Sequence, residues 1–254
     1  MKSILINAGI KPVYVEDVFS WIDQYNAGIS DLNTFSLAPS FTQIDTNYVW
    51  YGSEDEYTDV SRNWWKVNKY SYTDVLCRST AYYLMRDYLY EEELIPESEW
   101  HVSKDDNKIS ESWLVSDMNG IKTNPNLSFS DDEIAQYFSL FNPIPLPEGT
   151  HEMDMYTTIK DEWNIRGVSF REGSVSLITV WLQDMNLTAI GHAAVLAEYE
   201  EGLMLFEKTN PEYPYQATKF DSIEEVKDYM ISQFDSTFED GAGTLIVMKN
   251  NSLL

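Results

Sequence analysis

Three segments in the last third of the chain are apolar on both faces, and they constrain the fold more than any other feature of the sequence. They span residues 175–182, 188–199 and 203–208. A strand with one face in water alternates apolar and polar residues, so strands of this kind are expected inside a sheet that is covered on both sides. Residues 200–202, Glu-Glu-Gly, separate the last two segments and predict a hairpin turn.

Helix signals surround these strands. Ser130 with Glu133, and Ser222 with Glu225, have the spacing of a capping box. Apolar spacing and capping residues together predict four helices, over residues 16–25, 75–90, 130–140 and 222–234, and a last strand over residues 243–248. We therefore expect an α+β fold in which helices pack on a central antiparallel sheet.

The chain is expected to form a single domain over residues 1–254. Its 254 residues, 43% of them apolar, are enough for a large buried core. The first half, to about residue 150, is predicted to be helical and irregular, and the second half, from about residue 151, to be rich in sheet. Three prolines, Pro143, Pro145 and Pro147, end a predicted helix, and this stretch is short enough to be a loop within one domain.

The charge of the chain excludes some partners. Forty-two acidic against 17 basic residues give a formal net charge of -25, which repels nucleic acid and anionic membrane surfaces. No apolar run approaches a membrane span, and the three apolar residues 4–6 are too few for a signal-peptide core. The chain as given is expected to be soluble. If a leader has been removed, the protein would be secreted or at the cell surface. The sequence determines neither this localisation nor the oligomeric state.

The one cysteine, Cys77, is the strongest candidate for a functional residue. Capping oxygens at residues 72–74 place it in the first turn of a predicted helix. A helix N-terminus and a neighbouring imidazolium lower the pKa of a free thiol from about 8.5 to between roughly 3.5 and 7.5, which produces the reactive thiolate. A single buried cysteine is also commonly a small inert hydrophobe, so Cys77 alone does not indicate catalysis.

A histidine and a glutamate provide the partners that such a thiol needs. His192 begins an apolar run, and Glu207 ends the next predicted strand of the same hairpin. The turn at residues 200–202 places the two residues near the same end of paired strands and close to opposite one another. The carboxylate would then orient the imidazole, and the imidazole would act as base for Cys77.

Other side chains are candidates for binding the substrate or the oxyanion. The backbone N–H of Cys77 is one oxyanion donor, and the side chains considered for the second are Asn68, Tyr72 and Gln216. Arg78 fits either a substrate carboxylate or a structural salt bridge. Trp64 and Trp65 fit either a sugar- or peptide-binding surface or the core.

No cofactor or metal is expected. His151, Glu152 and Asp154 are potential metal ligands, but they lack the spacing of a His-Glu-x-x-His helix. Residues 105–107, Asp-Asp-Asn, lack the glycine and the distal glutamate of a calcium loop. The sequence also has no nucleophile elbow, phosphate-binding glycine loop or dinucleotide fingerprint.

The order cysteine, histidine, acid resembles that of the papain-like cysteine peptidase superfamily, including its cell-wall amidase and transglutaminase-like branches. Residues 191–195, Gly-His-Ala-Ala-Val, and residues 205–208, Leu-Phe-Glu-Lys, are similar to its histidine strand and third-residue strand. The resemblance implies a papain-like fold and catalytic roles for Cys77, His192 and Glu207. The chain departs from that pattern by having a glutamate as third residue and Ser71 where a glutamine often supplies the oxyanion donor.

More of the chain resembles an uncharacterised bacterial family, domain of unknown function 4300. The similar stretches are residues 18–26, 74–81, 206–208 and 214–220.

Two functions remain as hypotheses. The first is a thiol-dependent amide hydrolase or acyl transferase that acts on a peptide, a cell-wall fragment or another amide. The alternative is a non-catalytic papain-like module that binds a peptide, a glycan or a cationic protein.

Overall fold

The computed structural model describes residues 1–30, 42–44, 75–90, 117, 120–121, 124–184, 186–208, 215–234 and 243–254. Its helices are α1 (Lys2–Asn7), α2 (Pro12–Ser30), α4 (Cys77–Met85), α6 (Asp131–Phe141), α7 (Glu152–Ile165) and α8 (Ile223–Phe234). Its strands are β1 (Thr42–Ile44), β2 (Leu89–Tyr90), β3 (Ile144–Pro145), β4 (Ser169–Phe170), β5 (Val175–Asp184), β6 (Leu187–Tyr199), β7 (Gly202–Glu207), β8 (Gln216–Phe220), β9 (Leu245–Lys249) and β10 (Ser252–Leu253).

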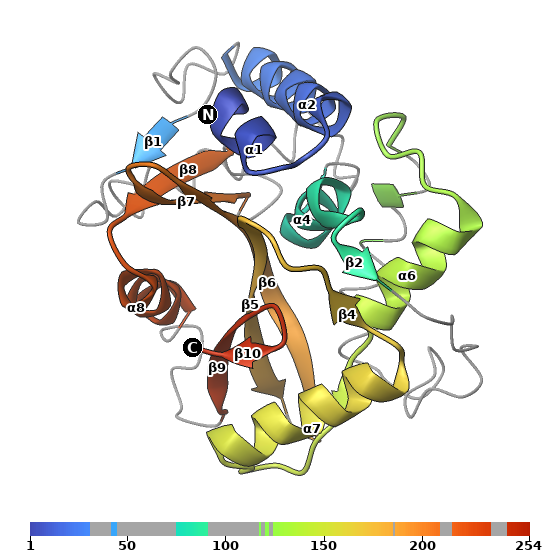
Figure 1. Ribbon diagram of the computed structural model, residues 1–254. Helices are drawn as coiled ribbons and strands as arrows, with labels where there is room; N and C mark the ends of the chain where they lie inside the picture. The colour runs from blue at the N-terminus through green and yellow to red at the C-terminus, as the bar shows by residue number, and fades with distance from the viewer. Residues whose placement is uncertain are drawn as a thin grey trace.

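One large, mainly antiparallel sheet organises the described part of the chain (Figure 1). Its strand order is β1-β8-β7-β6-β5-β9-β10, β3 pairs with β6, and β1 is parallel to β8. The three apolar segments form β5, β6 and β7 as predicted. Gly202 begins β7 with φ 131°, and a Cβ at this position would lie 2.8 Å from the Phe220 carbonyl oxygen, so the turn requires glycine.

Helices cover both faces of the sheet, which is why its central strands are apolar on both sides. One hydrophobic cluster joins α1, α2, α4, α6 and α7 to alternate residues of the strands, among them Leu177 and Val195. A second cluster joins α8 to the opposite face, through residues such as Ile178 and Leu196. Figure 1 shows α4 and α8 on opposite sides of β5 and β6. The expected α+β architecture with an antiparallel sheet is confirmed, while the single-domain boundary stays a prediction.

Several predicted element boundaries are wrong. The helix expected over residues 75–90 is α4, which starts at Cys77 and ends at Met85, because Leu89 and Tyr90 pair with β4 instead. The helix expected over residues 16–25 is longer, since Pro12 takes the first helical position, where a missing N–H costs nothing.

Helix α7 and strand β8 are among the elements that were not predicted. Helix α7 buries one narrow face through Met155, Ile159 and Trp163, so its apolar pattern is sparse. Strand β8 is short, and its buried residues include the polar Gln216 and Thr218, which do not give an apolar signal.

The capping prediction is confirmed for α6 and in part for α8. Ser130 Oγ accepts a hydrogen bond from Glu133 N (3.3 Å), and Glu133 Oε2 accepts one from Ser130 N (2.8 Å), which starts α6. At the start of α8 only half of the predicted box forms: Ser222 Oγ accepts a hydrogen bond from Glu225 N (3.2 Å), whereas Glu225 Oε2 accepts one from Asp221 N (2.9 Å) and not from Ser222 N. Each bond satisfies an N–H that has no partner within its helix.

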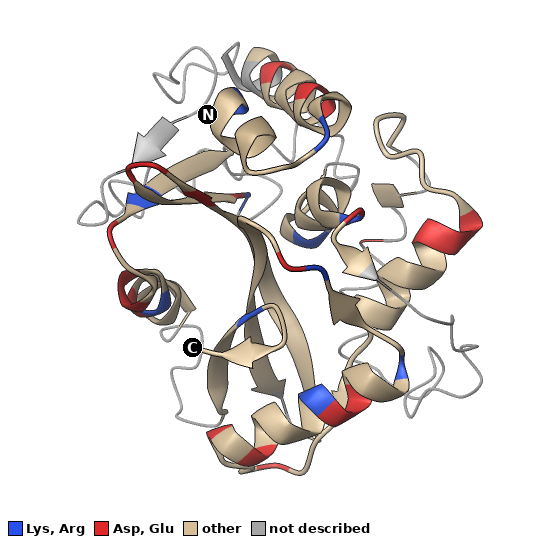
Figure 2. Cartoon of the chain, in the orientation of Figure 1, with Lys and Arg blue, Asp and Glu red and all other residues tan. Residues whose placement is uncertain are grey.

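Acidic residues lie mainly on the outer turns of the helices and on the β6–β7 turn (Figure 2). Acidic side chains in the first turn of α6, α7 and α8 also complement the positive end of each helix dipole. Among the described residues, none of the helices has the length and apolar character needed to span a membrane.

Candidate active site

Cys77 is the first residue of α4. The helix begins there because Ser79 Oγ accepts a hydrogen bond from the backbone N–H of Leu76 (2.9 Å). All residues of α4 are buried, so the helix lies within the protein and its N-terminus points into the interior. Cys77 itself is 7% exposed. The thiol therefore sits at the positive end of a buried helix dipole, where a thiolate is favoured over a thiol.

A β-bulge positions His192. Val180 of β5 pairs with His192, but the next residue, Trp181, pairs with Ile190, so the register of β6 steps past Gly191. A Cβ at Gly191 would collide with Leu182 Cδ1 and would lie 2.9 Å from Leu182 Cγ, so a larger residue here would force the Leu182 side chain to move. The extra residue changes which face of β6 the following side chains occupy.

The ring of His192 is fully buried on the face that α8 covers. It stacks against Phe234 at the end of α8, with the ring centroids 4.9 Å apart. The pairing of β6 with β7 ends at Val195 and Phe206, so His192 lies on a stretch of β6 beside which β7 no longer pairs.

Glu207 holds one nitrogen of that ring. His192 Nε2 and Glu207 Oε2 are 2.6 Å apart, and both side chains are buried. The last paired residues are Val195 and Phe206. One step further along the two strands, Glu207 comes opposite Ala194, which is two residues from His192. His192 and Glu207 are therefore diagonal neighbours near the same end of paired strands, with an offset of two residues along β6. Diagonal partners are within reach of side chains as long as glutamate and histidine.

The other carboxylate oxygen of Glu207 is also fixed. Oε1 accepts hydrogen bonds from Gln216 Nε2 (2.7 Å) and from the Tyr229 hydroxyl (2.7 Å). Gln216 Nε2 also donates to the Tyr229 oxygen (2.9 Å), which closes the arrangement. With three donors, Glu207 has its charge satisfied and its orientation set.

The charges of the site favour an ionised thiol. Burial raises the pKa of Cys77, but a hydrogen-bonding interaction with His192 and the charges of Arg78 and His192 outweigh it, so the pKa lies below its ordinary value. Burial lowers the pKa of His192, whereas Cys77 and Glu207 together raise it to about 9. Burial likewise opposes the ionised form of Glu207, yet His192, Tyr229 and Gln216 keep its pKa below the ordinary range. These interactions shift the pair toward a thiolate and an imidazolium.

The thiol and the imidazole are close without being fully aligned. Within the described part of the protein, His192 Nδ1 is buried and makes no hydrogen bond of normal geometry. Cys77 and His192 nevertheless shift each other's pKa through hydrogen-bonding and charge interactions. Because Nε2 is taken by Glu207, Nδ1 is the nitrogen left for the thiol. Loose geometry of this kind is common in active sites without substrate.

Arg78 is committed to protein groups. Its guanidinium makes two bonds to Asp117, Nε to Oδ2 (2.6 Å) and Nη2 to Oδ1 (2.8 Å), and Nη1 donates to the Ile190 carbonyl (3.0 Å). Of the two uses considered for Arg78, this geometry corresponds to the structural salt bridge. Gln216, considered as an oxyanion donor, instead directs its N–H groups to Glu207 and Tyr229.

The family model described as Domain of unknown function (DUF4300) matches residues 1–254. The chain belongs to this family. Comparisons with curated proteins and with solved structures found no match.

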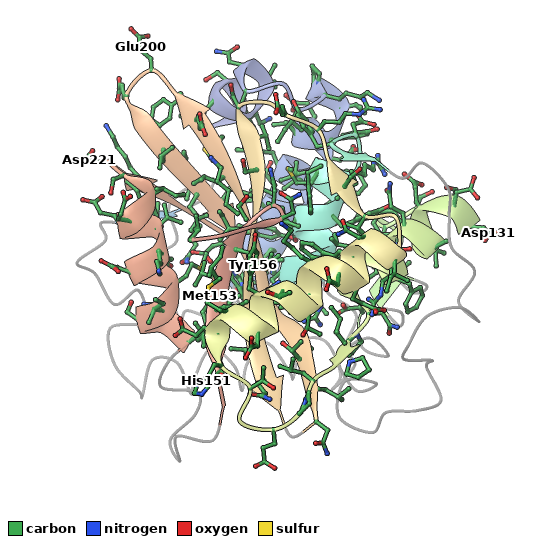
Figure 3. All side chains as sticks on the ribbon, turned by 60° about the horizontal axis from the view of Figure 1, so that its bottom comes forward. Asp131, His151, Met153, Tyr156, Glu200 and Asp221 are labelled. Atoms are coloured by element: carbon green, nitrogen blue, oxygen red, sulfur yellow. The ribbon has the colours of Figure 1, made fainter. Side chains whose placement is uncertain are left out.

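Some of the predicted site residues of this DUF4300 chain lie outside the described residues. They are Asn68, Tyr72, Trp64 and Trp65, together with Ser71 and residues 105–107. The potential metal ligands at residues 151–154 lie at the start of α7 and are exposed; Figure 3 shows His151 at the outer end of that helix. Among the described residues, the structure forms no cluster of three His, Cys, Asp or Glu side chains suited to a metal ion.

Three site residues were missed by sequence reasoning. Tyr229 and Phe234 lie on α8, and Asp117 lies far from Cys77 in sequence. The sequence does contain one signal for α8, since Tyr229 and Met230 form part of its apolar face, but that pattern does not distinguish a core tyrosine from one that binds a carboxylate. No local signal connects Asp117 to Arg78.

Proposed function

We propose that this DUF4300 chain is a thiol-dependent amide hydrolase or acyl transferase with a papain-like site. Cys77 is the nucleophile, His192 the base and then the acid, and Glu207 the residue that orients His192. The observation that carries the proposal is the buried His192–Glu207 hydrogen bond of 2.6 Å next to a thiol whose pKa is lowered. An activated nucleophile needs such a base, oriented by a third group.

The reaction follows from these protonation states. The Cys77 thiolate attacks the amide carbonyl carbon and forms a carbon–sulfur bond. The carbon–nitrogen bond then breaks as imidazolium His192 gives its proton to the leaving amine, which leaves a thioester on Cys77. Neutral His192 next takes a proton from water, or from an acceptor amine or hydroxyl, as this nucleophile attacks the thioester and releases the thiolate.

The oxyanion of each tetrahedral intermediate needs hydrogen-bond donors. The first N–H groups of a helix have no partner within it, so the backbone N–H of Cys77 is placed to donate. The helix dipole of α4 adds a positive potential at the same point. The backbone N–H of Cys77 is also the oxyanion donor that the sequence analysis expected.

The papain-like assignment is supported by a cysteine at the start of a buried helix, followed in sequence by a histidine and an acid on neighbouring strands of an antiparallel sheet. A peptide, a cell-wall fragment or another amide fits this chemistry. The charge of -25 disfavours nucleic-acid substrates.

One observation favours the alternative, a binding module with an inactive site. Cys77 is 7% exposed and His192 is fully buried, so little of the pair faces solvent. A binding module of this kind would hold a peptide, a glycan or a cationic protein on its acidic surface.

Labelling with a haloacetamide at near-neutral pH tests the proposal, with mass spectrometry to locate the label. Wild type is expected to be labelled at Cys77, and His192→Ala at least about tenfold more slowly, because the imidazolium that stabilises the thiolate is gone. His151→Ala, at an exposed histidine, is the matched control and should react like wild type. Circular dichroism verifies that the variants are folded.

Equally slow labelling of wild type and His192→Ala would contradict an activated thiol and would favour the alternative function, a binding module. If the thiol is activated, wild type and Cys77→Ala are compared on a panel of peptides and cell-wall fragments. Release of an amine by wild type alone identifies the substrate class.

A further inference from the structure

We infer that Arg78 is a positioning residue of the proposed site: it ties the helix of Cys77 to the strand of His192 and fixes a positive charge beside the thiol. This inference rests on the proposed function for its catalytic meaning. The contacts of Arg78 carry it independently of any substrate.

Arg78 is adjacent in sequence to the nucleophile and reaches the strand that bears the base. It follows Cys77 directly, and its Nη1 donates to the carbonyl of Ile190 (3.0 Å), two residues before His192. Ile190 stands next to the bulge at Gly191, where the register of β6 changes. The Arg78 side chain therefore connects the start of α4, which carries Cys77, to the backbone of β6 close to His192.

Asp117 holds the guanidinium in this position. Two parallel hydrogen bonds, of 2.6 and 2.8 Å, fix the plane of Arg78. The hydroxyl of Tyr137 donates to the same carboxylate, to Oδ2, at 2.6 Å. All three side chains are buried, so the geometry is defined by the protein interior and not by solvent. A bidentate pair of this kind restricts orientation as well as distance.

The charged and titratable groups around Cys77 come from three elements and from Asp117. Arg78 lies on α4, His192 on β6 and Tyr137 on α6. Burial raises the pKa of Cys77, His192 and Arg78 lower it, and Asp117 raises it. Removing Arg78 would leave Asp117 opposing the thiolate without its counter-charge. The thiol is then expected to ionise at higher pH.

Lysine cannot replace the arginine fully. An ammonium group keeps the charge but lacks the planar fork that bonds to Asp117 and to Ile190 at once. Arg78→Lys is thus expected to retain part of the electrostatic effect and to lose the fixed geometry.

The test is the pH dependence of haloacetamide labelling at Cys77, which gives the pH midpoint of thiol ionisation. Arg78→Met is expected to raise the midpoint by about one pH unit or more, and so to slow labelling by about tenfold at a pH below the wild-type midpoint. Arg78→Lys is expected to fall between Arg78→Met and wild type. The matched control, Arg86→Met, removes a charge from the C-terminal end of the same helix and should leave the midpoint unchanged.

A folded Arg78→Met variant with the wild-type midpoint would overturn the inference. If that variant does not fold, Arg78→Lys decides: a raised midpoint supports the role of Arg78, and a wild-type midpoint overturns it. A purely structural arginine would change thermal stability but not the midpoint. A different result would contradict the proposed function itself: a wild-type Cys77 thiol that ionises at its ordinary pKa.

Discussion

His192 and Glu207 are diagonal neighbours on two antiparallel strands, and their side chains meet at 2.6 Å between Nε2 and Oε2. This contact assigns Nε2 to the carboxylate and leaves Nδ1 for Cys77. Two further donors fix the carboxylate from behind, so the ring is oriented before any substrate binds.

The first prediction concerns pH. The pKa of Cys77 lies below its ordinary value and that of His192 is raised to about 9. Labelling should therefore rise through the lowered thiol pKa and stay high above pH 9, because the thiolate persists. Amide hydrolysis should follow the same lower limb but fall above about pH 9, where His192 no longer has a proton for the leaving amine. Parallel profiles for labelling and hydrolysis up to pH 10 would contradict the acid role of His192.

Glu207→Gln should weaken the imidazolium. Loss of the carboxylate is expected to lower the pKa of His192 from about 9 and to move the upper limb of hydrolysis to lower pH. The rate should also fall roughly a hundredfold or more, since an orienting acid is lost. Steady-state kinetics across pH measure both effects. Glu201→Gln, on the exposed β6–β7 turn, is the control and should retain the wild-type pH profile. If the upper limb of hydrolysis stays at the wild-type pH in Glu207→Gln, Glu207 has no role in the proposed site.

Tyr229→Phe should destabilise the protein by about 1.5–3 kcal/mol, because it removes a buried hydrogen bond to a charged group. The pKa of Glu207 is lowered in the folded state, so its contribution to stability is present above the ordinary value of 4.5 and is lost as the pH falls through the lowered pKa. The difference between variant and wild type should shrink accordingly in acid. Urea unfolding at several pH values measures it.

The control for that experiment is Tyr156→Phe, whose hydroxyl makes an exposed hydrogen bond to the Asn251 carbonyl. Its change should stay within about 0.5 kcal/mol. A similar small, pH-independent change in Tyr229→Phe would mean that Tyr229 does not stabilise ionised Glu207.

Gly191→Ala should cost about 1–3 kcal/mol of stability and slow the labelling of Cys77. The new Cβ would collide with Leu182, and relief of that collision would displace the bulge that precedes His192. A double-mutant cycle with Leu182→Val measures the coupling by urea unfolding. The double variant is expected to be more stable than the sum of the single changes predicts; simple additivity would show that the collision is not the cause.

The central strands and two helix starts were predictable because their signals are local. Residues 175–182 and 188–199 are apolar on both faces, and Ser130 with Glu133 forms its capping box within four residues. The end of α4 was not predictable in this way. Leu89 continues a helical pattern, but pairing with Phe170 takes it into a strand, and that partner is far away in the sequence.

The sequence by itself determined which segments form the sheet, the position of Cys77 at a helix start and the hairpin that brings His192 near Glu207. The strands and the hairpin depend on periodicity and turn residues, which act over a few positions. Cys77 does begin a helix, but Leu76 is the N-cap and not one of the residues 72–74. Only the tertiary structure decided the two-residue offset between His192 and Glu207, the contribution of Tyr229 to the carboxylate, and the link from Arg78 through Asp117 and Ile190. Strand register, the bulge at Gly191 and buried hydrogen bonds arise when remote segments pack together, so no local pattern encodes them.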